Sequence, residues 1–386
     1  MSLRPAATGR SAGRSTRRPR ARRPRGASRV GQRFEAVVGP VAHGGHCVAR
    51  LEPQGRVVFV RHALPGERVV LEVTEGTDGD RFWRADAVEV LEPSPDRVPA
   101  PCPYAGPGRC GGCDFQHVTL ARQRALKADV VREQLSRLAR LDVDVHIEEV
   151  PGEPPHEHDG LRWRTRQRYV DLPDGGHGMR LHRSHEVIEV DDCLIAGAPA
   201  RHVVHGLPFE VEQDGFWQVH PGAPEVLVDT VLDFLQPRAG ETVLDLYAGV
   251  GLFARFLADR VGAAAVTLVE GDQRACGHAV VNVPGATVLP GDVGSVLAEL
   301  PAAAVDLVVL DPPREGARRS VVEAVVVRRP RAVAYVACDP AALARDVAIF
   351  AEHGYRLGGL RGFDLFPMTH HVECVALLTK TASDLR

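Results

Sequence analysis

The second half of the chain alternates short apolar runs with longer stretches of helical periodicity. The runs span residues 242–246, 265–269, 286–289, 305–310 and 332–337, and a further run at 375–379 ends the series. Apolar strands separated by helix-length segments are typical of a parallel sheet with helices on both faces. The pattern therefore predicts a doubly wound, Rossmann-like α/β domain over residues 216–386.

The first half of the chain predicts two smaller domains. Residues 34–92 contain five short apolar runs separated by glycine- and proline-containing turns, which indicates a β-barrel of the oligonucleotide-binding type. Such a barrel can bind RNA or serve only as a structural module. Residues 93–215 combine a cysteine-rich stretch, a helix from Thr119 to Arg140 and strand-like alternation. We expect a central α+β domain there, with Thr119 capping the helix.

Arginines are concentrated in the tail and in the central domain. Residues 1–33 contain eleven arginines and no acidic residue, although the whole chain has a formal net charge of −3. We expect this segment to be disordered, either as a tether to RNA phosphates or as a solubilising extension. Residues 162–168 carry arginine at every second position, which predicts one basic face of a strand and favours a nucleic-acid surface. The central helix also carries basic residues, Lys127 among them, opposite its apolar side.

A glycine turn follows the first strand of the α/β domain. Gly249 and Gly251 fit the dinucleotide pattern, which is weak evidence on its own. Asp245 ends the preceding strand, where a carboxylate can receive an ammonium group. Glu270 ends the next strand, where it can accept hydrogen bonds from both ribose hydroxyls, and Asp292 follows the third, where an adenine contact is expected. These acids suit S-adenosylmethionine or a nicotinamide cofactor.

Three further features favour methyl transfer from S-adenosylmethionine. Asp311 opens a stiff Asp-Pro-Pro-Arg loop at a strand end, Cys338 ends the following strand, and Glu373 comes 35 residues later. Carbon 5 of uracil is too weakly nucleophilic to attack a sulfonium unless a thiolate first adds to C6. A general base must then remove the C5 proton. The pattern predicts Cys338 as the nucleophile, with a thiolate favoured by the helix that follows it, and Glu373 as the base.

Four cysteines form a separate cluster in the central domain. Cys102, Cys110 and Cys113 lie close together in the sequence, and Cys193 lies eighty residues further on. Four thiolates with a C-x-x-C core suit either zinc or an iron–sulfur cluster, and their spacing does not decide between the two. In a chain without an export signal, clustered cysteines indicate metal ligation rather than disulfides.

Taken together, residues 34–380 resemble the S-adenosylmethionine-dependent RNA (uracil-5-)-methyltransferases that act on 23S ribosomal RNA and tRNA. The resemblance implies a TRAM domain at 34–92, a central domain with a [4Fe-4S] cluster at 93–215 and a class I methyltransferase domain at 216–386. It also favours 23S rRNA over tRNA as the substrate. The matching residues fall into three groups, which are Cys338 and Glu373 for catalysis; Gln218, Tyr247, Glu270 and Asp311 for the cofactor; and Cys102, Cys110, Cys113 and Cys193 for the cluster.

Some positions depart from the family pattern. The gap between Cys102 and Cys110 is longer than expected, and His220 stands where asparagine is common. Asp339 follows Cys338 where the family usually has asparagine, and we expect its charge to raise the pKa of the thiol.

Two other functions are compatible with parts of the pattern. The same fold could methylate another base or an amine, but amine methylation needs no thiol. A non-catalytic iron–sulfur protein that binds RNA would not need Cys338 or the Asp311 loop. The chain has no apolar run of 18 residues and no signal-peptide core, so we expect a cytoplasmic protein without membrane contact. The resemblance to RNA enzymes of this build implies a monomer.

Overall fold

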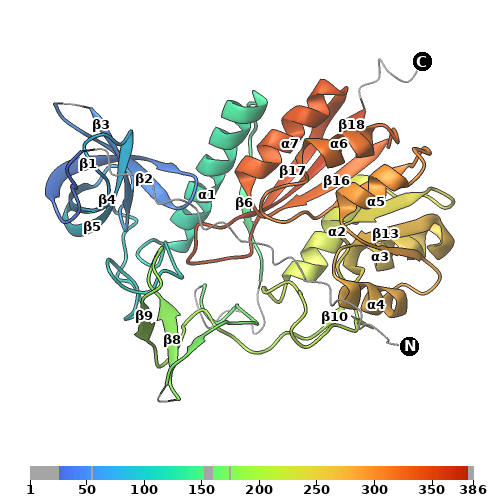
Figure 1. Ribbon diagram of the computed structural model, residues 1–386, viewed down its shortest axis with the longest axis horizontal. Helices are drawn as coiled ribbons and strands as arrows, with labels where there is room; N and C mark the ends of the chain where they lie inside the picture. Colours follow the sequence, from blue (N-terminus) through green and yellow to red (C-terminus); the bar gives the residue numbers. More distant parts are fainter. Residues whose placement is uncertain (1–25, 54, 152–159, 174, 381–386) are drawn as a thin grey trace, which may run out of the picture.

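The computed structural model describes residues 26–53, 55–151, 160–173 and 175–380. Three parts follow one another along the chain: a barrel, a central segment and a large sheet covered by helices (Figure 1). Most of the predicted basic tail, residues 1–25, lies outside the described residues. Within the described part of the chain, no helix is long and apolar enough to cross a membrane.

The first part is a closed five-stranded barrel, as the sequence predicted. Its strands are β1 (Arg33–Ala42), β2 (His46–Leu51), β3 (Arg56–Arg61), β4 (Arg68–Glu75) and β5 (Phe82–Glu92), joined in the order β1-β2-β3-β5-β4. Alternate residues of the strands point inward, so that Val58 and Val60 of β3 and Val69, Leu71 and Val73 of β4 are buried. Closure of the barrel leaves no free strand edges.

The central segment consists of one helix and several short strands. Helix α1 (Leu120–Gln134) continues into a π-helical turn at Leu135–Ala139 and ends at Arg140, which has a φ of 55°. Thr119 precedes the helix as predicted, but its side chain makes no capping hydrogen bond. The small strands are β6 (Ile147–Glu149), β7 (Val170–Asp171), β8 (His177–Arg180), β9 (Val187–Glu189), β10 (Val203–Val204) and β11 (Leu207–Pro208).

Two predictions for the central segment are wrong. Residues 162–168 do not form a strand with one basic face, because Arg162 has a φ of 57°, Trp163 is buried, and only Arg164 makes a β-bridge, to Ala196. Lys127 does not lie on an exposed basic face, because α1 contacts α7 as well as the barrel and this contact buries that side of the helix.

The third part is an eight-stranded sheet in the order β14-β13-β12-β15-β16-β18-β17-β6. Strands β12 (Val243–Leu246), β13 (Val266–Glu270), β14 (Thr287–Pro290), β15 (Leu307–Leu310) and β16 (Ala332–Ala337) are parallel. Strand β18 (Glu373–Lys380) runs antiparallel between β16 and β17 (Tyr355–Asp364), and β6 of the central segment adds the last, parallel strand. The sequence did not reveal β17 or the addition of β6.

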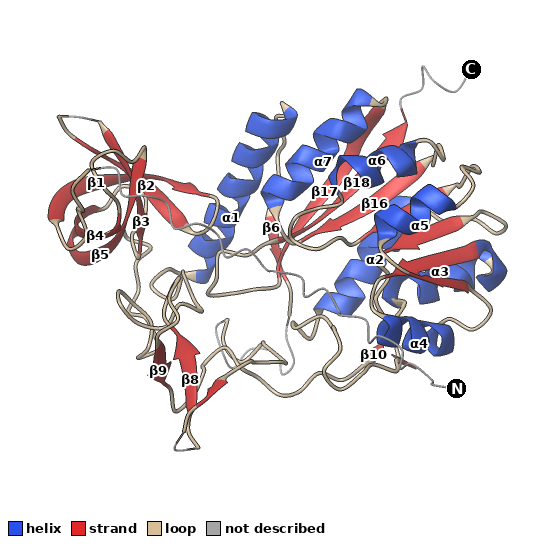
Figure 2. Ribbon diagram, in the orientation of Figure 1, coloured by secondary structure: helices blue, strands red, loops and turns tan. Residues whose placement is uncertain are grey.

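Helices cover both faces of this sheet, which confirms the predicted doubly wound architecture (Figure 2). One core lies under α2 (Ala223–Leu235), α3 (Leu252–Val261) and α4 (Gln273–Asn282). The other lies under α5 (Val293–Glu299), α6 (Arg318–Val326) and α7 (Pro340–Glu352), and α1 contributes to it. The sheet edge at the carboxyl ends of the parallel strands is therefore left as the place where functional side chains can gather.

Candidate active site

The predicted thiol directly follows β16, and the predicted base is the first residue of the neighbouring strand β18. Strand β16 pairs with β18 in a register that places Ala337 opposite Cys374. Cys338 follows Ala337 in the chain, and Glu373 precedes Cys374. Because the two strands are antiparallel, Cys338 and Glu373 lie at the same edge of the sheet. The charge of Glu373 acts on the pKa of Cys338. The structure therefore brings the two side chains together.

Burial and negative charge dominate the titration behaviour of this pair. Burial, followed by the charges of Glu373 and Asp311, raises the pKa of Cys338 to about 12. Burial, followed by the charge of Asp311, holds the pKa of Glu373 well above its ordinary value. The expected thiolate is thus not favoured in the free protein. Although α7 begins two residues later, its amino terminus and the nearby Arg314 do not outweigh burial and the surrounding carboxylates.

The glycine turn after β12 has the tight backbone that a cofactor site needs. Tyr247, Gly249 and Gly251 have φ values of 63°, 56° and 87°. A Cβ on Gly251 would lie 2.7 Å from Cγ2 of Val283, so the turn packs directly against its neighbours. Burial raises the pKa of the Tyr247 hydroxyl, which is half-buried, to about 12.

Asp245 is fully buried beneath this turn. One of its carboxylate oxygens accepts a hydrogen bond from the backbone N–H of Ala254, at 2.9 Å. The other oxygen is buried and has no hydrogen-bond partner among the residues that the structure describes. Burial raises the pKa of this carboxyl to about 8. An unpartnered carboxylate oxygen at this position suits a cationic ligand group, as the sequence predicted.

The other acidic residues predicted to contact the cofactor, Glu270, Asp311 and Asp292, differ in their hydrogen bonds and in their pKa shifts. Glu270 accepts hydrogen bonds from the backbone N–H of Gly249 at 2.8 Å and of Asp272 at 2.7 Å. Burial, followed by the charge of Glu270, raises the pKa of Asp311 to about 7. Asp292 caps α5 by accepting from the backbone N–H and the hydroxyl of Ser295, at 3.0 Å each.

Gln218 is half-buried in the loop that leads into α2. No hydrogen bond between described residues joins Gln218 or Asp292 to the strand-end carboxylates. The structure thus gathers Asp245, Glu270, Asp311, Cys338 and Glu373, whose charges act on one another. The charge of Asp292 acts on Tyr247.

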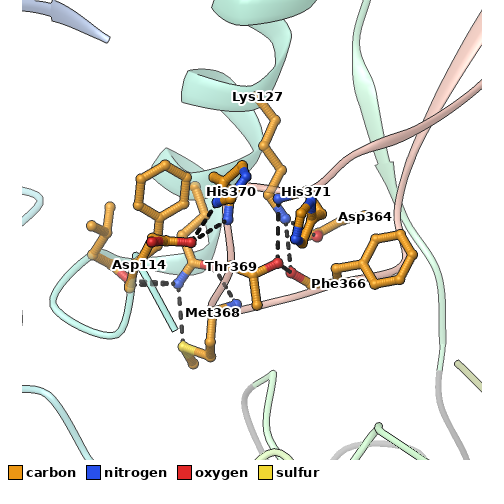
Figure 3. A network of polar contacts seen from close by, with 11 residues as sticks. Asp114, Lys127, Asp364, Phe366, Met368, Thr369, His370 and His371 are labelled. Carbon is orange, nitrogen blue, oxygen red and sulfur yellow. Dashed lines mark hydrogen bonds and ion pairs between the residues drawn. The ribbon is translucent and has the colours of Figure 1, made fainter. Parts of the chain in front are cut away.

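Side chains of the central segment hold the loop that leads into Glu373 (Figure 3). The sequence did not reveal these contacts. The ammonium group of Lys127 donates to Asp364, at 2.6 Å, and to the carbonyl of Phe366, at 3.0 Å. The ring of His370 pairs through Nδ1 with Asp114, at 2.5 Å. The side chain of Gln123 accepts from the backbone N–H of Met368 at 2.8 Å, and Met368 in turn accepts at its carbonyl from Phe115 at 3.0 Å.

Cys338 lies on the wall of a cavity of about 200 Å³ between the barrel, α1 and the sheet. Its wall also includes the barrel turn at residues 43–45, Arg314 and His371. The cavity is large enough for a single heterocyclic base, and it has cationic and hydrogen-bonding groups beside the thiol.

The four central cysteines line a second cavity, of about 450 Å³. Burial raises the pKa of Cys110 and of Cys193, and that of Cys113 to about 12. Arg164, Arg166 and Arg168 line the same cavity. In the described ranges, however, no three His, Cys, Asp or Glu side chains are arranged to hold a metal ion, so the structure does not show the expected cluster.

Three family models match this chain. The model described as tRNA (Uracil-5-)-methyltransferase matches residues 298–381, a TRAM domain model matches residues 27–88, and the Methyltransferase small domain matches residues 225–332. Together they cover the barrel and most of the large sheet.

Similar proteins span nearly the whole chain. An RNA methyltransferase of Streptomyces coelicolor is 45% identical over 93% of this chain and 95% of its own length. The 23S rRNA (uracil(1939)-C(5))-methyltransferases RlmD of Shewanella amazonensis and Chromohalobacter salexigens are 30% and 33% identical, covering 92% and 88% of this chain and 97% and 88% of their own. The Pyrococcus abyssi tRNA (uracil-54, C5)-methyltransferase, solved with S-adenosyl-L-homocysteine, has a TM-score of 0.64 and 21% identity over 90% of this chain and 100% of its own, which shows a shared fold.

Proposed function

Because the chain belongs to the S-adenosylmethionine-dependent RNA (uracil-5-)-methyltransferases and carries a TRAM domain, we propose that it methylates C5 of a uridine through a covalent adduct with Cys338. The observation that carries this mechanism is the register of β16 and β18, which sets the carboxyl group of Glu373 beside a thiol that lines a base-sized cavity. Neither methylation of an amine nor a pure binding function needs this pair.

In this mechanism each side chain acts on a stated atom. The thiolate of Cys338 adds to C6 of the uracil, so that C5 becomes nucleophilic. S-adenosylmethionine supplies the methyl group that C5 takes up. The carboxylate of Glu373 then removes the C5 proton, and the sulfur leaves C6 as the C5–C6 double bond forms again. The target base must leave its stack to enter the cavity at Cys338.

The raised pKa values of the site fit a cationic cofactor. Burial, followed by the charges of neighbouring carboxylates, raises the pKa values of Asp245, Asp311 and Glu373. A sulfonium and an ammonium group bound among them would favour the ionised carboxylates. We infer that cofactor binding prepares Glu373 to act as a base. For cofactor contacts we propose Gln218, Asp245, Tyr247, Gly249, Gly251, Glu270, Asp292 and Asp311.

A [4Fe-4S] cluster is part of the proposal for the central segment. Four thiols that line one cavity are the donor set such a cluster takes, and Cys102, Cys110, Cys113 and Cys193 would hold it. The cluster would act as a structural centre, because the methyl transfer moves no electrons. Iron and acid-labile sulfide content after anaerobic purification, compared with a Cys113→Ser variant, tests this assignment.

We propose 23S rRNA as the substrate and tRNA as the alternative. The RlmD relatives, which carry 23S rRNA in their names, align over nearly their whole length at 30% and 33% identity. The Pyrococcus tRNA enzyme supports only the fold. Methylation of unmodified 23S rRNA and tRNA transcripts by the purified protein tests the choice. Incorporation confined to tRNA would overturn it.

A further inference from the structure

The barrel reaches the loop of the proposed nucleophile through one side chain. His43 lies in the turn between β1 and β2, and its Nε2 atom is 2.8 Å from Oδ2 of Asp339, the residue that follows Cys338. Residues 43–45 and Cys338 line the same cavity of about 200 Å³. Gly45 has a φ of 77°, and a Cβ there would lie 2.7 Å from Cβ of His370. The turn is therefore built closely against the site.

Asp339 is held as an anion by its partners. Its Oδ1 atom accepts from the backbone N–H of Ala342, at 2.8 Å, and caps α7. Burial opposes ionisation, but the hydrogen bond with His43 and this cap leave the pKa of Asp339 below its ordinary value. Asp311 and Glu373 have raised pKa values by contrast. Of the three carboxyl groups that act on the thiol, Asp339 is thus the one whose pKa is lowered.

The charge of Asp339 opposes ionisation of the Cys338 thiol. The charge of the side chain paired with Asp339 changes the size of this effect. Asp339 contributes to the raised pKa of the thiol. The charged and titratable groups that act on the thiol or on Asp339, or line the shared cavity, are His43, Lys127, Asp311, Arg314, Asp339, Arg345, His370, His371 and Glu373. Among the described residues, His43 is the side chain that forms a hydrogen bond with the Asp339 carboxylate.

We propose that His43 is a positioning residue for methyl transfer: by pairing with Asp339 it offsets the carboxylate's charge and favours the thiolate of Cys338. The TRAM barrel is in this way a functional part of the methyltransferase site. The pair also accounts for how this chain accommodates an acid directly after its nucleophile. The inference rests on the proposed role of Cys338.

Alkylation of Cys338 by iodoacetamide in the intact free protein, read from its peptide by mass spectrometry, tests the pair without RNA. The rate follows the thiolate fraction. His43→Ala removes the imidazole partner of Asp339 and leaves its carboxylate with the backbone N–H of Ala342, so we expect alkylation near pH 6 to slow by about three- to tenfold. His43→Gln, which keeps a hydrogen-bond donor but no charge, gives the same loss.

Two further variants separate the pair from other roles of the turn. In an Asp339→Asn background, His43→Ala has no effect on the alkylation rate. His205→Ala removes a matched pair, since Nε2 of His205 lies 2.8 Å from Oδ1 of Asp229 on α2, and leaves Cys338 alkylation unchanged. Methyl transfer to RNA near pH 6 falls in parallel with alkylation in the His43 variants.

Three results would overturn the proposal. They are an unchanged alkylation rate in His43→Ala, an equal loss from His43→Ala with and without the Asp339→Asn substitution, and a normal rate in His43→Gln. Because alkylation needs neither RNA nor cofactor, these outcomes are independent of the proposed function. Methyl transfer that survives in Cys338→Ala would instead show that the proposed function has failed.

Discussion

The buried ion pair between Lys127 and Asp364 supports the loop that leads into Glu373, and its removal should be costly. The two side chains are 0% and 2% exposed, and the charged atoms are 2.6 Å apart. Lys127→Met keeps most of the side-chain volume but leaves the Asp364 carboxylate buried without a counter-charge. Removing one partner of such a pair costs about 3–5 kcal/mol.

Urea unfolding of the variant measures this loss in the free energy of unfolding. Arg319→Met is the matched control, because Arg319 and Glu352 are also paired at 2.7 Å but are 52% and 53% exposed. Such exposed pairs contribute little to stability, because water and salt screen the charges. The double variant Lys127→Met/Asp364→Leu should recover most of the stability, because no unpaired charge is left.

The same variant should also affect the site. Since Lys127 additionally holds the carbonyl of Phe366, we expect faster hydrogen exchange in residues 365–372 and slower methyl transfer in Lys127→Met. The reasoning is refuted if Lys127→Met destabilises the protein no more than Arg319→Met, or if the double variant is less stable than Lys127→Met.

The remaining predictions concern the cofactor and the base. The affinity for S-adenosylmethionine, measured by calorimetry, should rise between about pH 6 and pH 9. A cation prefers the ionised forms of Asp311 and Asp245, whose pKa values are about 7 and 8. An affinity that does not change with pH would contradict this. Gly251→Val should abolish cofactor binding while the barrel stays folded, since φ is 87° and the added carbon would meet Val283 at 2.7 Å; retained binding would contradict a role for this turn. Glu373→Gln should accumulate a covalent RNA–protein complex that survives denaturing electrophoresis, because the sulfur leaves only after the C5 proton is lost; release of methylated RNA at the wild-type rate would exclude Glu373 as the base.

The parallel strands and their ends were readable from the sequence because each strand is a short, mainly apolar run. Asp311 and Cys338 each follow such a run, Asp245 lies one residue before the end of β12, and the carboxyl ends of parallel strands lie at one edge. The position of Glu373 beside Cys338 was not readable in this way. It depends on the antiparallel insertion of β18 between β16 and β17, which pairs segments far apart in the sequence.

The contacts of the central segment with the rest of the chain could not be predicted from the sequence, for a different reason. Helical periodicity places Lys127 on a polar side of α1, but the packing of α1 against α7 and the loop after β17 buries that side. Alternating arginines suggested a strand at 162–168, whereas hydrogen bonds from Arg162 to Asp192 and to the carbonyls of Cys193 and Ala196 fix an irregular backbone. Tertiary contacts of this kind leave no periodic signal in a single sequence.

The most direct test of the covalent mechanism combines two labels in one assay. Acceptor RNA with tritium at C5 of its uridines is incubated with methyl-labelled S-adenosylmethionine and either wild-type protein or Cys338→Ala. Methyl incorporation matched by tritium release in the wild type, with neither in the variant, is the result predicted here. Incorporation without tritium release, or incorporation that survives in Cys338→Ala, would contradict attack by Cys338 and place the methyl group on another atom.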